Sequence, residues 1–496
     1  MELDAEHCYQ AFLTHDPRFD GRVFAGVVTT GIYCRPICPV VPARFENTRF
    51  FACAAAAEAA GFRPCRRCRP ETAPGTPAWL GTSAVVGRAL RLIAENGFGD
   101  SDVDQLAQRL GLGARQLRRL FAKHLGASPL EIARARRVHF ARTLIGETDL
   151  PMTEVAFSAG FSSIRQFNHA LRHTFGQSPT ELRRRRGRHA SLGQDAGLLM
   201  RLPYRPPLDW GTMLRFLTPR ATPGVEIVHH DSYNRTIDAD GTAGTIEVWQ
   251  EATPHAGTPH LLLRVQLGSY GRLIHVVERV RRMFDLDADP WCIANHLRRS
   301  SRLSALIEAS PGLRLPGAWD GFELGVRAIL GQQVTVRSAT TLAGRLVQAF
   351  GRPVEACGSG LTHLFPRPEV LAGADLSVIG LPQSRAASIR ALAAAVSRGD
   401  LVFGTSPGLE DAIARLCAIS GIGPWTANYI AMRAFGEPDA FPASDLGLRR
   451  ALGNRRRTLS AARVARIAED WRPWRAYAAI HLWTAVTGRD ISAAKE

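Results

Sequence analysis

Four cysteines near the N-terminus have the spacing of a tetrahedral metal site. Cys34 and Cys38 form one close pair, and Cys65 and Cys68 form a second pair further along the chain. Two thiolate pairs of this kind suit zinc, which takes four sulfur or nitrogen ligands in a tetrahedron. The sequence therefore predicts that these four cysteines bind one zinc ion. The simpler alternative is a zinc that only holds a small module together, since a short segment has little hydrophobic core of its own.

Basic side chains adjoin this cysteine cluster. Arg35, Arg66 and Arg67 each stand next to one of the four cysteines. Their positive charge favours the thiolate over the thiol, and a guanidinium is a good partner for a phosphate group. A zinc-bound thiolate can also act as a nucleophile toward an alkyl group. The cluster is therefore a candidate for alkyl transfer, and these three arginines are candidate DNA contacts.

A second candidate site lies near the C-terminus. The stretch Ser420–Ala427 follows the end of a predicted helix, contains Gly421 and Gly423, and leads through Pro424 into another helix. Glycines allow a close backbone approach, and the free N–H groups at a helix start bind phosphate. This pattern predicts a helix-hairpin-helix, although the glycine turn alone is a weak signal. Asp445 follows downstream, and a carboxylate can stabilise positive charge on a sugar or orient an attacking water.

Between these two sites the chain contains an internal repeat. The segment Leu106–Leu112 recurs in residue type as Val155–Phe161. Each copy predicts a helix, a tight turn and a second helix, with the second helices over Ala114–Leu125 and Ile164–Phe175. Such second helices lie in the major groove of DNA, where arginine and glutamine side chains read base edges. The alternative is a plain helical bundle with a basic solvent face. The candidate DNA-reading residues are Arg115, Arg118, Arg165 and Gln166.

The elements that position these residues fall into four segments, as the 496-residue length allows at ordinary domain sizes. Residues 1–75 are cysteine-rich, and residues 82–188 read as short amphipathic helices followed by a linker over 187–197. Alternating apolar and polar runs in residues 201–286 predict strands, and residues 287–496 return to helical periodicity. The predicted fold class is multidomain, mainly α with α+β parts. It combines a small zinc domain, a helical DNA-binding domain, a β-rich lobe and a helical hairpin domain.

The charge of the whole chain indicates a polyanionic partner. The formal net charge is +17 and the sequence pI is near 10.3, so nucleic acid is the first candidate. No apolar run is long enough to cross a membrane, and the N-terminus has no secretory signal. The sequence therefore predicts a bacterial cytoplasmic protein that associates with the nucleoid and has no membrane partner.

The first two segments resemble known families. Thr29–Pro39 together with Gly61–Cys68 resembles the N-terminal zinc domain of the Ada family, and residues 85–185 resemble AraC-type transcription factors. The Ada resemblance implies that Cys34 accepts a methyl group from a DNA phosphotriester, once per molecule, while it and the other three cysteines hold zinc. It also implies a transcription activator whose affinity for promoter DNA rises once Cys34 is alkylated, with RNA polymerase as a further partner.

The second half resembles another family. The matching stretches are Leu313–Gly317, Gly325–Gln332, Gly423–Tyr429 and Trp471–Ala478, and with the hairpin and Asp445 they resemble AlkA, the 3-methyladenine DNA glycosylase of the helix-hairpin-helix superfamily. The resemblance runs from about residue 201 to 490. It implies a β-rich lobe followed by a helical domain with a cleft between helical layers.

The AlkA resemblance assigns roles to individual residues. It implies that Asp445 is the catalytic carboxylate and that Trp425, Tyr429 and Trp483 line a pocket for an extruded, cationic base. Such a pocket attracts a cationic base by cation–π interactions, worth about 0.5–2 kcal/mol each. Gln333 takes the place of the apolar residue that wedges into the DNA, so the chain departs from the family at that position.

Composition excludes one mechanism for this second half. Glycosylases that also cut the strand form a Schiff base through a lysine, and the only lysines here are Lys123 and Lys495. We therefore predict a monofunctional hydrolase that needs no cofactor in its glycosylase half. The whole sequence predicts an alkylation repair and response protein that acts on double-stranded, alkylated and promoter DNA. One alternative is a regulator whose glycosylase half only binds DNA. Another is an active glycosylase whose N-terminal half only docks on DNA.

Overall fold

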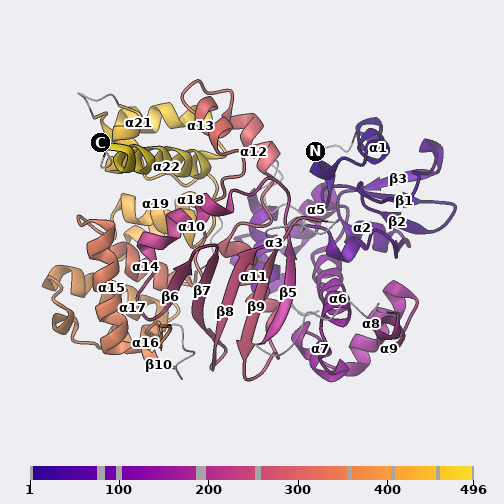
Figure 1. The fold of residues 1–496 in the computed structure, drawn as a ribbon, viewed down its shortest axis with the longest axis horizontal. Helices are drawn as coiled ribbons and strands as arrows, with labels where there is room; N and C mark the ends of the chain where they lie inside the picture. The colour runs from indigo at the N-terminus through magenta and orange to yellow at the C-terminus, as the bar shows by residue number, and fades with distance from the viewer. Residues whose placement is uncertain are drawn as a thin grey trace.

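The structure, a computed structural model, runs from an N-terminal module through a helical region and a five-stranded sheet to a second helical region (Figure 1). It describes residues 4–74, 84–96, 103–185, 197–251, 258–354, 360–403, 408–453 and 458–493. The predicted linker over 187–197 lies outside the described residues except for Gly197. Among the described helices, none combines the length and the apolar character that a membrane-spanning helix needs.

The N-terminal module is built on a four-stranded sheet of order β3-β1-β2-β4. Strand β1 pairs antiparallel with β2 and β3, and β2 runs parallel to β4. Gly31 forms the turn between β1 and β2 with a φ of +65°, which side chains other than glycine rarely adopt. The pairing of β2 with β4 places the two cysteine pairs at neighbouring strand ends. The elements are α1 (Ala5–Leu13), η1 (Pro17–Phe19), β1 (Phe24–Val27), β2 (Ile32–Cys34), η2 (Phe45–Asn47), β3 (Thr48–Phe51), α2 (Ala54–Ala59), β4 (Arg63–Pro64) and η3 (Pro70–Thr72).

The helical region that follows contains the two repeated units. Both second helices end at a glycine in the left-handed conformation, Gly126 and Gly176. Both next helices then begin with a serine capping box and a proline in the first turn. The predicted second helices, Ala114–Leu125 and Ile164–Phe175, are confirmed. The elements are α3 (Ala84–Asn96), α4 (Val103–Arg109), α5 (Ala114–Leu125), α6 (Pro129–Glu147), α7 (Met152–Ser158), α8 (Ile164–Phe175) and α9 (Pro179–Arg184).

The third part is an antiparallel sheet of order β5-β9-β8-β7-β6. The strands predicted from alternating runs are confirmed as β8 and β9. Helices α10 and α11 pack on the sheet, with Trp210 and Phe284 in edge-to-face contact at the centre. The elements are β5 (Leu198–Pro203), α10 (Trp210–Leu217), η4 (Thr218–Arg220), β6 (Glu226–His229), β7 (Ser232–Ala239), β8 (Thr242–Gln250), β9 (His260–Leu267) and α11 (Leu273–Met283).

The C-terminal part is almost entirely helical, with its own large core. The predicted hairpin is confirmed: α18 ends just before it, and Pro424 is the first residue of α19. These features confirm the predicted fold class. The elements are α12 (Pro290–Leu297), α13 (Ser304–Ala309), α14 (Gly321–Leu330), α15 (Val336–Phe350), β10 (Arg352–Pro353), β11 (His363–Leu364), α16 (Pro368–Ala372), η5 (Leu376–Ile379), α17 (Gln383–Ser397), α18 (Leu409–Cys417), α19 (Pro424–Arg433), α20 (Leu446–Ala451), α21 (Ala461–Ala468), η6 (Glu469–Trp471) and α22 (Arg475–Ala493).

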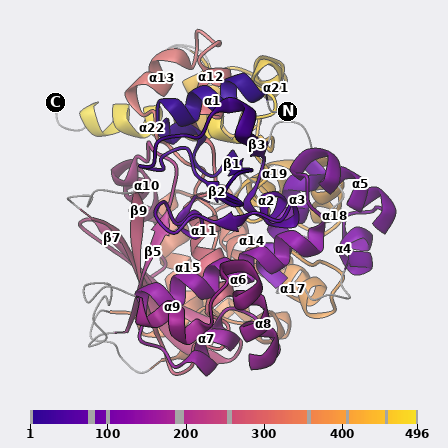
Figure 2. The same cartoon turned by 90° about the vertical axis from the view of Figure 1, so that its right-hand side faces the viewer.

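The hydrophobic cores cross the boundaries between these parts. One cluster of buried side chains includes Phe167 of α8 together with Met200 and Val265 of the five-stranded sheet. Another includes Ala56 of α2 together with Leu117 of α5. In Figure 2 the N-terminal module lies above α6–α9, with α3–α5 beside them. The packing therefore joins the repeated helical units to both of their neighbours.

Helix α3 also contacts the C-terminal part through buried charges. Arg88 donates from Nε to Glu437 Oε1 at 2.8 Å, and Arg91 Nη2 lies 3.4 Å from the same oxygen. Arg91 also donates to the backbone oxygen of Phe435. Glu437 is 4% exposed and stands in the connection between α19 and α20, which also carries Asp445. The first helical region thus stabilises the segment that carries the candidate catalytic carboxylate.

Replacing Arg88 with alanine is expected to destabilise the C-terminal part by about 3 kcal/mol. The substitution leaves the Glu437 carboxylate buried without its nearest partner, which is costlier than losing a surface ion pair. Denaturant unfolding followed by tryptophan fluorescence measures the effect. The matched control is Arg398→Ala, which breaks an exposed pair with Asp400 and is expected to cost less than about 1 kcal/mol. Equal losses in the two variants would contradict this stabilising role.

Candidate functional site

The carboxylate of Asp445 accepts three hydrogen bonds from uncharged donors. The residue caps the N-terminus of α20, where Oδ1 accepts from the backbone N–H of Leu448 at 3.0 Å. The indole Nε1 of Trp425 donates to Oδ2 at 3.0 Å, and that of Trp483 donates to Oδ1 at 2.8 Å. Within the described part of the chain, Asp445 forms no ion pair with a basic side chain. Its negative charge is therefore held in place without being neutralised.

The three aromatic residues assigned to a base pocket lie together beside this carboxylate. Trp425 stacks on Tyr429 with ring centroids 5.5 Å apart and an interplanar angle of 8°. Tyr429 and Trp483 have centroids 6.2 Å apart and are inclined at 57°. Trp425 and Tyr429 share a face of α19, as their spacing predicts, and Trp483 comes from α22. All three side chains are half-buried. The structure therefore brings together the residues that the sequence grouped by resemblance.

The hydroxyl of Tyr429 is held by an arginine that the sequence analysis did not single out. Arg433 donates from Nη1 to this hydroxyl at 2.6 Å and from Nε to the backbone oxygen of Pro316 at 2.9 Å. Burial alone raises the pKa of Tyr429, but the positive charges of Arg433 and Arg220 outweigh it, so the pKa lies below its usual value. Arg433 follows Tyr429 by one turn of α19. This spacing could have indicated from the sequence that the two side chains meet.

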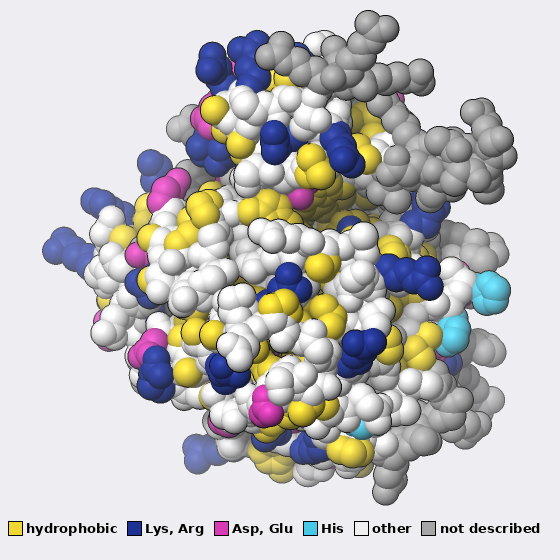
Figure 3. All heavy atoms as spheres, turned by 90° about the vertical axis from the view of Figure 1, so that its left-hand side faces the viewer, with side chains coloured by type: hydrophobic (Ala, Val, Ile, Leu, Met, Phe, Trp, Pro, Cys, Tyr) yellow, Lys and Arg dark blue, Asp and Glu magenta, His cyan; other side chains and the backbone are white. Residues whose placement is uncertain are grey.

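The five-stranded lobe also reaches this site. Phe216 of α10 packs against the C-terminal core, and the guanidinium carbons of Arg220 and Arg433 lie 3.9 and 5.2 Å from the centre of its ring. Nothing in the sequence near Phe216 indicated a site residue, because Arg433 and the C-terminal core that it contacts lie far along the chain. Figure 3, which faces this side of the molecule, shows a recess with hydrophobic side chains in it and basic side chains around it.

The hairpin between α18 and α19 requires its first glycine. Gly421 has a φ of +84°, and a Cβ there would lie 1.8 Å from Ser388 Oγ. Gly423 is exposed, and a Cβ there would meet nothing within 4 Å. It caps α19, so the free N–H groups of the first turn face outward, an arrangement suited to a phosphate. Both glycines remain candidate DNA contacts. Gly421 gives the hairpin its backbone conformation, and Gly423 stands at the start of α19.

The four cysteines of the N-terminal module form a compact donor set. The sulfur atoms of Cys34, Cys38, Cys65 and Cys68 all lie within 4.8 Å of one another. A tetrahedral zinc thiolate site has sulfur atoms about 3.8 Å apart, from a Zn–S length of about 2.3 Å, so the donors fit this metal. Three of these cysteines are buried, and Cys34 is the one that is partly exposed. A cavity of about 580 Å³ is lined by Cys34 and also by Phe175 of α8.

Two cysteines outside this cluster, Cys8 and Cys53, are buried. Burial raises the pKa of Cys8 to about 11 and that of Cys53 to about 12, so both remain thiols at neutral pH. Each is almost fully buried in a hydrophobic cluster. Both therefore contribute to the packing of the module.

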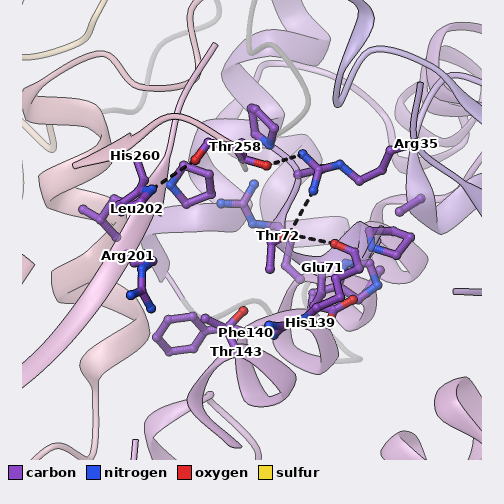
Figure 4. A pocket seen from close by; sticks show the side chains of 18 of the residues that line it. Arg35, Glu71, Thr72, His139, Phe140, Thr143, Arg201, Leu202, Thr258 and His260 are labelled. Atoms are coloured by element: carbon purple, nitrogen blue, oxygen red, sulfur yellow. Dashed lines mark hydrogen bonds and ion pairs between the residues drawn. The ribbon is translucent and has the colours of Figure 1, made fainter. Parts of the chain in front are cut away.

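One of the three arginines beside the cysteines has a different role from the one predicted. Arg35 is 1% exposed and pairs with the Asp20 carboxylate. It also donates to the backbone oxygen of Cys68 at 3.1 Å and to Thr258 Oγ1 at 2.8 Å (Figure 4). The prediction that Arg35 contacts DNA phosphate is therefore corrected: its guanidinium joins the N-terminal module to the five-stranded lobe. Arg66 and Arg67 are exposed and remain candidates.

The repeated helices present most of their candidate residues to solvent. Arg115 and Arg118 of α5 and Arg165 of α8 are exposed. Gln166 is half-buried, and its side-chain oxygen accepts a hydrogen bond from Ser162 Oγ at 3.1 Å. Three of these four residues are thus free to approach a DNA groove without rearrangement.

A buried network connects the cysteine module to helix α6. His139 Nε2 lies 2.7 Å from Glu58 Oε1, and Tyr33, the neighbour of Cys34, donates to the same oxygen at 2.8 Å. Burial lowers the pKa of His139. The negative charge of Glu58 and its hydrogen bond raise this pKa by more than burial lowers it, so the net shift is upward. The ring of His139 lies 6.5 Å from that of Phe175 in α8. The network thus extends from the strand that carries Cys34 to the second repeated unit.

The stabilisation from His139 is expected to disappear as pH rises. Because its folded pKa lies above the unfolded value of 6.5, the Glu58–His139 pair contributes fully below that pH and is lost as pH rises through the folded pKa. The melting temperature difference between the native protein and His139→Gln should therefore shrink as the pH rises above the unfolded pKa of 6.5. His169→Gln, which changes an exposed histidine of α8, is the control. A difference that stays constant with pH would exclude a charged His139.

Models of known protein families match stretches in all four parts of the chain. Family models match the metal binding domain of Ada at residues 7–71, a helix-turn-helix domain at 106–185, the AlkA N-terminal domain at 199–320 and the HhH-GPD superfamily base excision DNA repair protein at 326–474. The resemblances indicated by the sequence motifs are therefore confirmed.

Individual relatives agree with these models. The chain is 36% identical over 286 residues to DNA-3-methyladenine glycosylase 2 of Escherichia coli, covering 57% of this chain and 95% of that protein. It is 32% identical over 181 residues to the bifunctional transcriptional activator/DNA repair enzyme Ada of Escherichia coli, covering 36% of this chain and 49% of that protein. It is 44% identical over 488 residues to the probable bifunctional transcriptional activator/DNA repair enzyme AlkA of Mycobacterium tuberculosis, covering 98% of this chain and 97% of that protein. This chain therefore belongs to the family of bifunctional transcriptional activator/DNA repair enzymes AlkA.

Proposed function

We propose that this protein removes alkylated purines such as 3-methyladenine from double-stranded DNA and activates transcription in response to alkylation. The observation that carries the glycosylase function is the Asp445 carboxylate, held by the indoles of Trp425 and Trp483 beside Tyr429. The glycosylase relatives support the substrate class, since their names specify 3-methyladenine.

The geometry supports a hydrolytic mechanism for base removal. The damaged nucleotide leaves the base stack, and its base packs against the aromatic faces of Trp425 and Tyr429. As the bond between sugar and base breaks, its electrons go to the cationic base, which leaves neutral. The Asp445 carboxylate stabilises the positive charge that develops on the sugar. Water then bonds to the sugar carbon and loses a proton, leaving an abasic site. This half of the protein needs no cofactor in the proposed reaction.

The absence of a nearby lysine from the sequence supports a monofunctional reaction. A Schiff base requires an amine at the sugar carbon, and the sequence has no lysine between Lys123 and Lys495. Borohydride treatment during turnover is therefore expected to trap no covalent complex with DNA. A trapped complex would show that the strand is attacked by an amine of the protein.

The N-terminal part supports a second, stoichiometric reaction. One zinc ion, bound by the four cysteines, would keep the Cys34 sulfur as a nucleophilic thiolate. Cys34 is the accessible member of the set and faces the cavity, so it is the methyl acceptor in this proposal. The new bond joins sulfur to the methyl carbon, the methyl–oxygen bond breaks, and the DNA phosphotriester becomes a phosphodiester. Arg66 and Arg67 would hold the adjacent phosphates.

The regulatory role rests on the repeated helices. Arg115, Arg118 and Arg165 would enter the grooves of promoter DNA, with RNA polymerase recruited as the next partner. The site of action would be the nucleoid in the bacterial cytoplasm.

Two assays test the proposal in the full-length protein. Release of free 3-methyladenine from methylated DNA tests the glycosylase, and a protein that binds this DNA without releasing base would be a regulator only. Transfer of labelled methyl groups from phosphotriester DNA to the native protein and to Cys34→Ser tests the acceptor. Equal labelling of the two would show that Cys34 is not the acceptor.

A further inference from the structure

The loop between α14 and α15 presents an unusual residue next to the hairpin. Gln333 has a φ of +57°, in the left-handed region that residues other than glycine and asparagine rarely occupy. Its side chain is exposed, as are those of Val334 and Val336, which are 38% and 41% exposed. A strained backbone conformation at an exposed loop tip persists only where the surrounding structure holds it, and such positions concentrate at functional sites.

The neighbouring residue supplies that support. Gln332 donates from Nε2 to the backbone oxygen of Gly421 at 2.9 Å and to Thr426 Oγ1 at 3.0 Å. The backbone oxygen of Gln332 accepts a hydrogen bond from Arg385 Nη2 at 2.8 Å. The loop is therefore fixed to the hairpin on one side and to α17 on the other. Gln333 is presented in a fixed position beside the proposed phosphate-binding turn.

The chemistry of Gln333 differs from that of an apolar wedge. Extrusion of a nucleotide leaves a gap in the duplex and an unpaired base on the other strand. That base has hydrogen-bond donors and acceptors on its pairing edge. Placing them against an apolar group costs free energy, because they lose their hydrogen-bond partners. A glutamine amide offers one acceptor and two donor hydrogens, so it can satisfy such an edge where an aliphatic side chain cannot.

We propose that Gln333 enters the duplex beside the extruded nucleotide and that its amide hydrogen-bonds the base left on the opposite strand. Gln333 is then a specificity-determining residue, because excision depends on the hydrogen-bonding groups of the opposite base. The exposed Val334 and Val336 pack against the neighbouring sugars and bases, while the amide supplies the polar contact. This inference rests on the proposed glycosylase function.

The test compares two opposite bases of the same shape. Duplexes carry one lesion opposite either thymine or difluorotoluene, a thymine isostere with little hydrogen-bonding capacity, and base release is measured in single turnover. Because thymine also pairs with the lesion before extrusion, the ratio of the rate opposite thymine to the rate opposite the isostere is compared between proteins. Gln333→Leu should lower this ratio by about 2- to 12-fold relative to the native protein, the range expected for one net hydrogen bond. Gln333→Asn, which retains the amide, should lower the ratio less.

The ratio of the two release rates, measured for each variant, distinguishes loss of the contact with the opposite base from a general distortion of the loop. Loop distortion slows release opposite both bases alike, whereas loss of the amide contact changes their ratio. Gln348→Leu makes the same substitution at an exposed position of α15 and should keep the native ratio. If Gln333→Leu keeps the native ratio, the inference is wrong although the glycosylase function stands. If the native protein releases no base opposite thymine, the proposed function itself fails.

Discussion

Asp445→Asn is expected to lower the rate of 3-methyladenine release by about 10²–10³-fold or more while leaving affinity for alkylated DNA nearly unchanged. The substitution removes the negative charge that stabilises the developing positive charge on the sugar, and it preserves the size of the side chain. In the proposed complex the extruded base contacts the aromatic rings of Trp425 and Tyr429, which the substitution leaves unchanged, so we expect binding to persist. The measurement is single-turnover release of free base, together with a binding titration of methylated duplex.

The hydrogen bonds around Asp445 explain why this variant should fold. Asparagine is as good an N-cap as aspartate, so its oxygen can still accept from the backbone N–H of Leu448. The amide nitrogen must then face the indole N–H of Trp425, where two donors meet and one hydrogen bond is lost. The expected cost to stability is about 1 kcal/mol, which is small beside the catalytic effect.

The control for this variant is an equal change of charge elsewhere in the same domain. Asp411→Asn removes an exposed carboxylate of α18 that pairs with Arg415 and should leave base release at the native rate. A near-native rate in Asp445→Asn would show that another group stabilises the sugar, and the enzymatic assignment of this carboxylate would have to be abandoned. Loss of DNA affinity in parallel with rate would instead indicate a misfolded site.

Sequence reasoning succeeded where function depends on short-range pattern. The cysteine pairs, the Gly421 turn and the stacking of Trp425 on Tyr429 all follow from spacing within one or two elements. The two repeated helices were located to the residue because each ends in a glycine and is followed by a serine capping box. In each case local geometry alone determines which side chains meet.

Two residues whose roles could not be predicted from the sequence, Arg35 and Phe216, contact elements that are distant in the chain. Arg35 was predicted to contact phosphate because it stands next to Cys34, yet its partners Asp20 and Thr258 come from separate elements. Phe216 belongs to the five-stranded lobe and reaches the site only because that lobe packs on the helical domain. A buried ion pair and an exposed DNA contact use the same residue type, so composition alone cannot distinguish them.

Removal of zinc is expected to unfold the N-terminal module while base excision continues. The longest strands of this module have four residues, and its hydrophobic clusters are small. In modules of this kind the metal supplies the folding free energy, and zinc binding by four thiolates contributes on the order of 10 kcal/mol. The Asp445 site should survive, because the groups that donate to this carboxylate all belong to the C-terminal part, which has its own large core.

Hydrogen exchange and base release, measured on the same sample, distinguish these effects. A chelator should strip protection from residues 4–74 and abolish methyl transfer, and added zinc should restore both. Cys68→Ser should behave like the chelated protein, whereas Cys417→Ser, at an exposed cysteine outside the cluster, should behave like the native protein. Ala56 of α2 and Leu117 of α5 lie in one hydrophobic core, so loss of zinc should also lower the hydrogen-exchange protection of α5. If zinc is lost and protection in α5 does not fall at all, the module and α5 are not coupled, and alkylation at Cys34 has no route through this core to the first proposed DNA-reading helix.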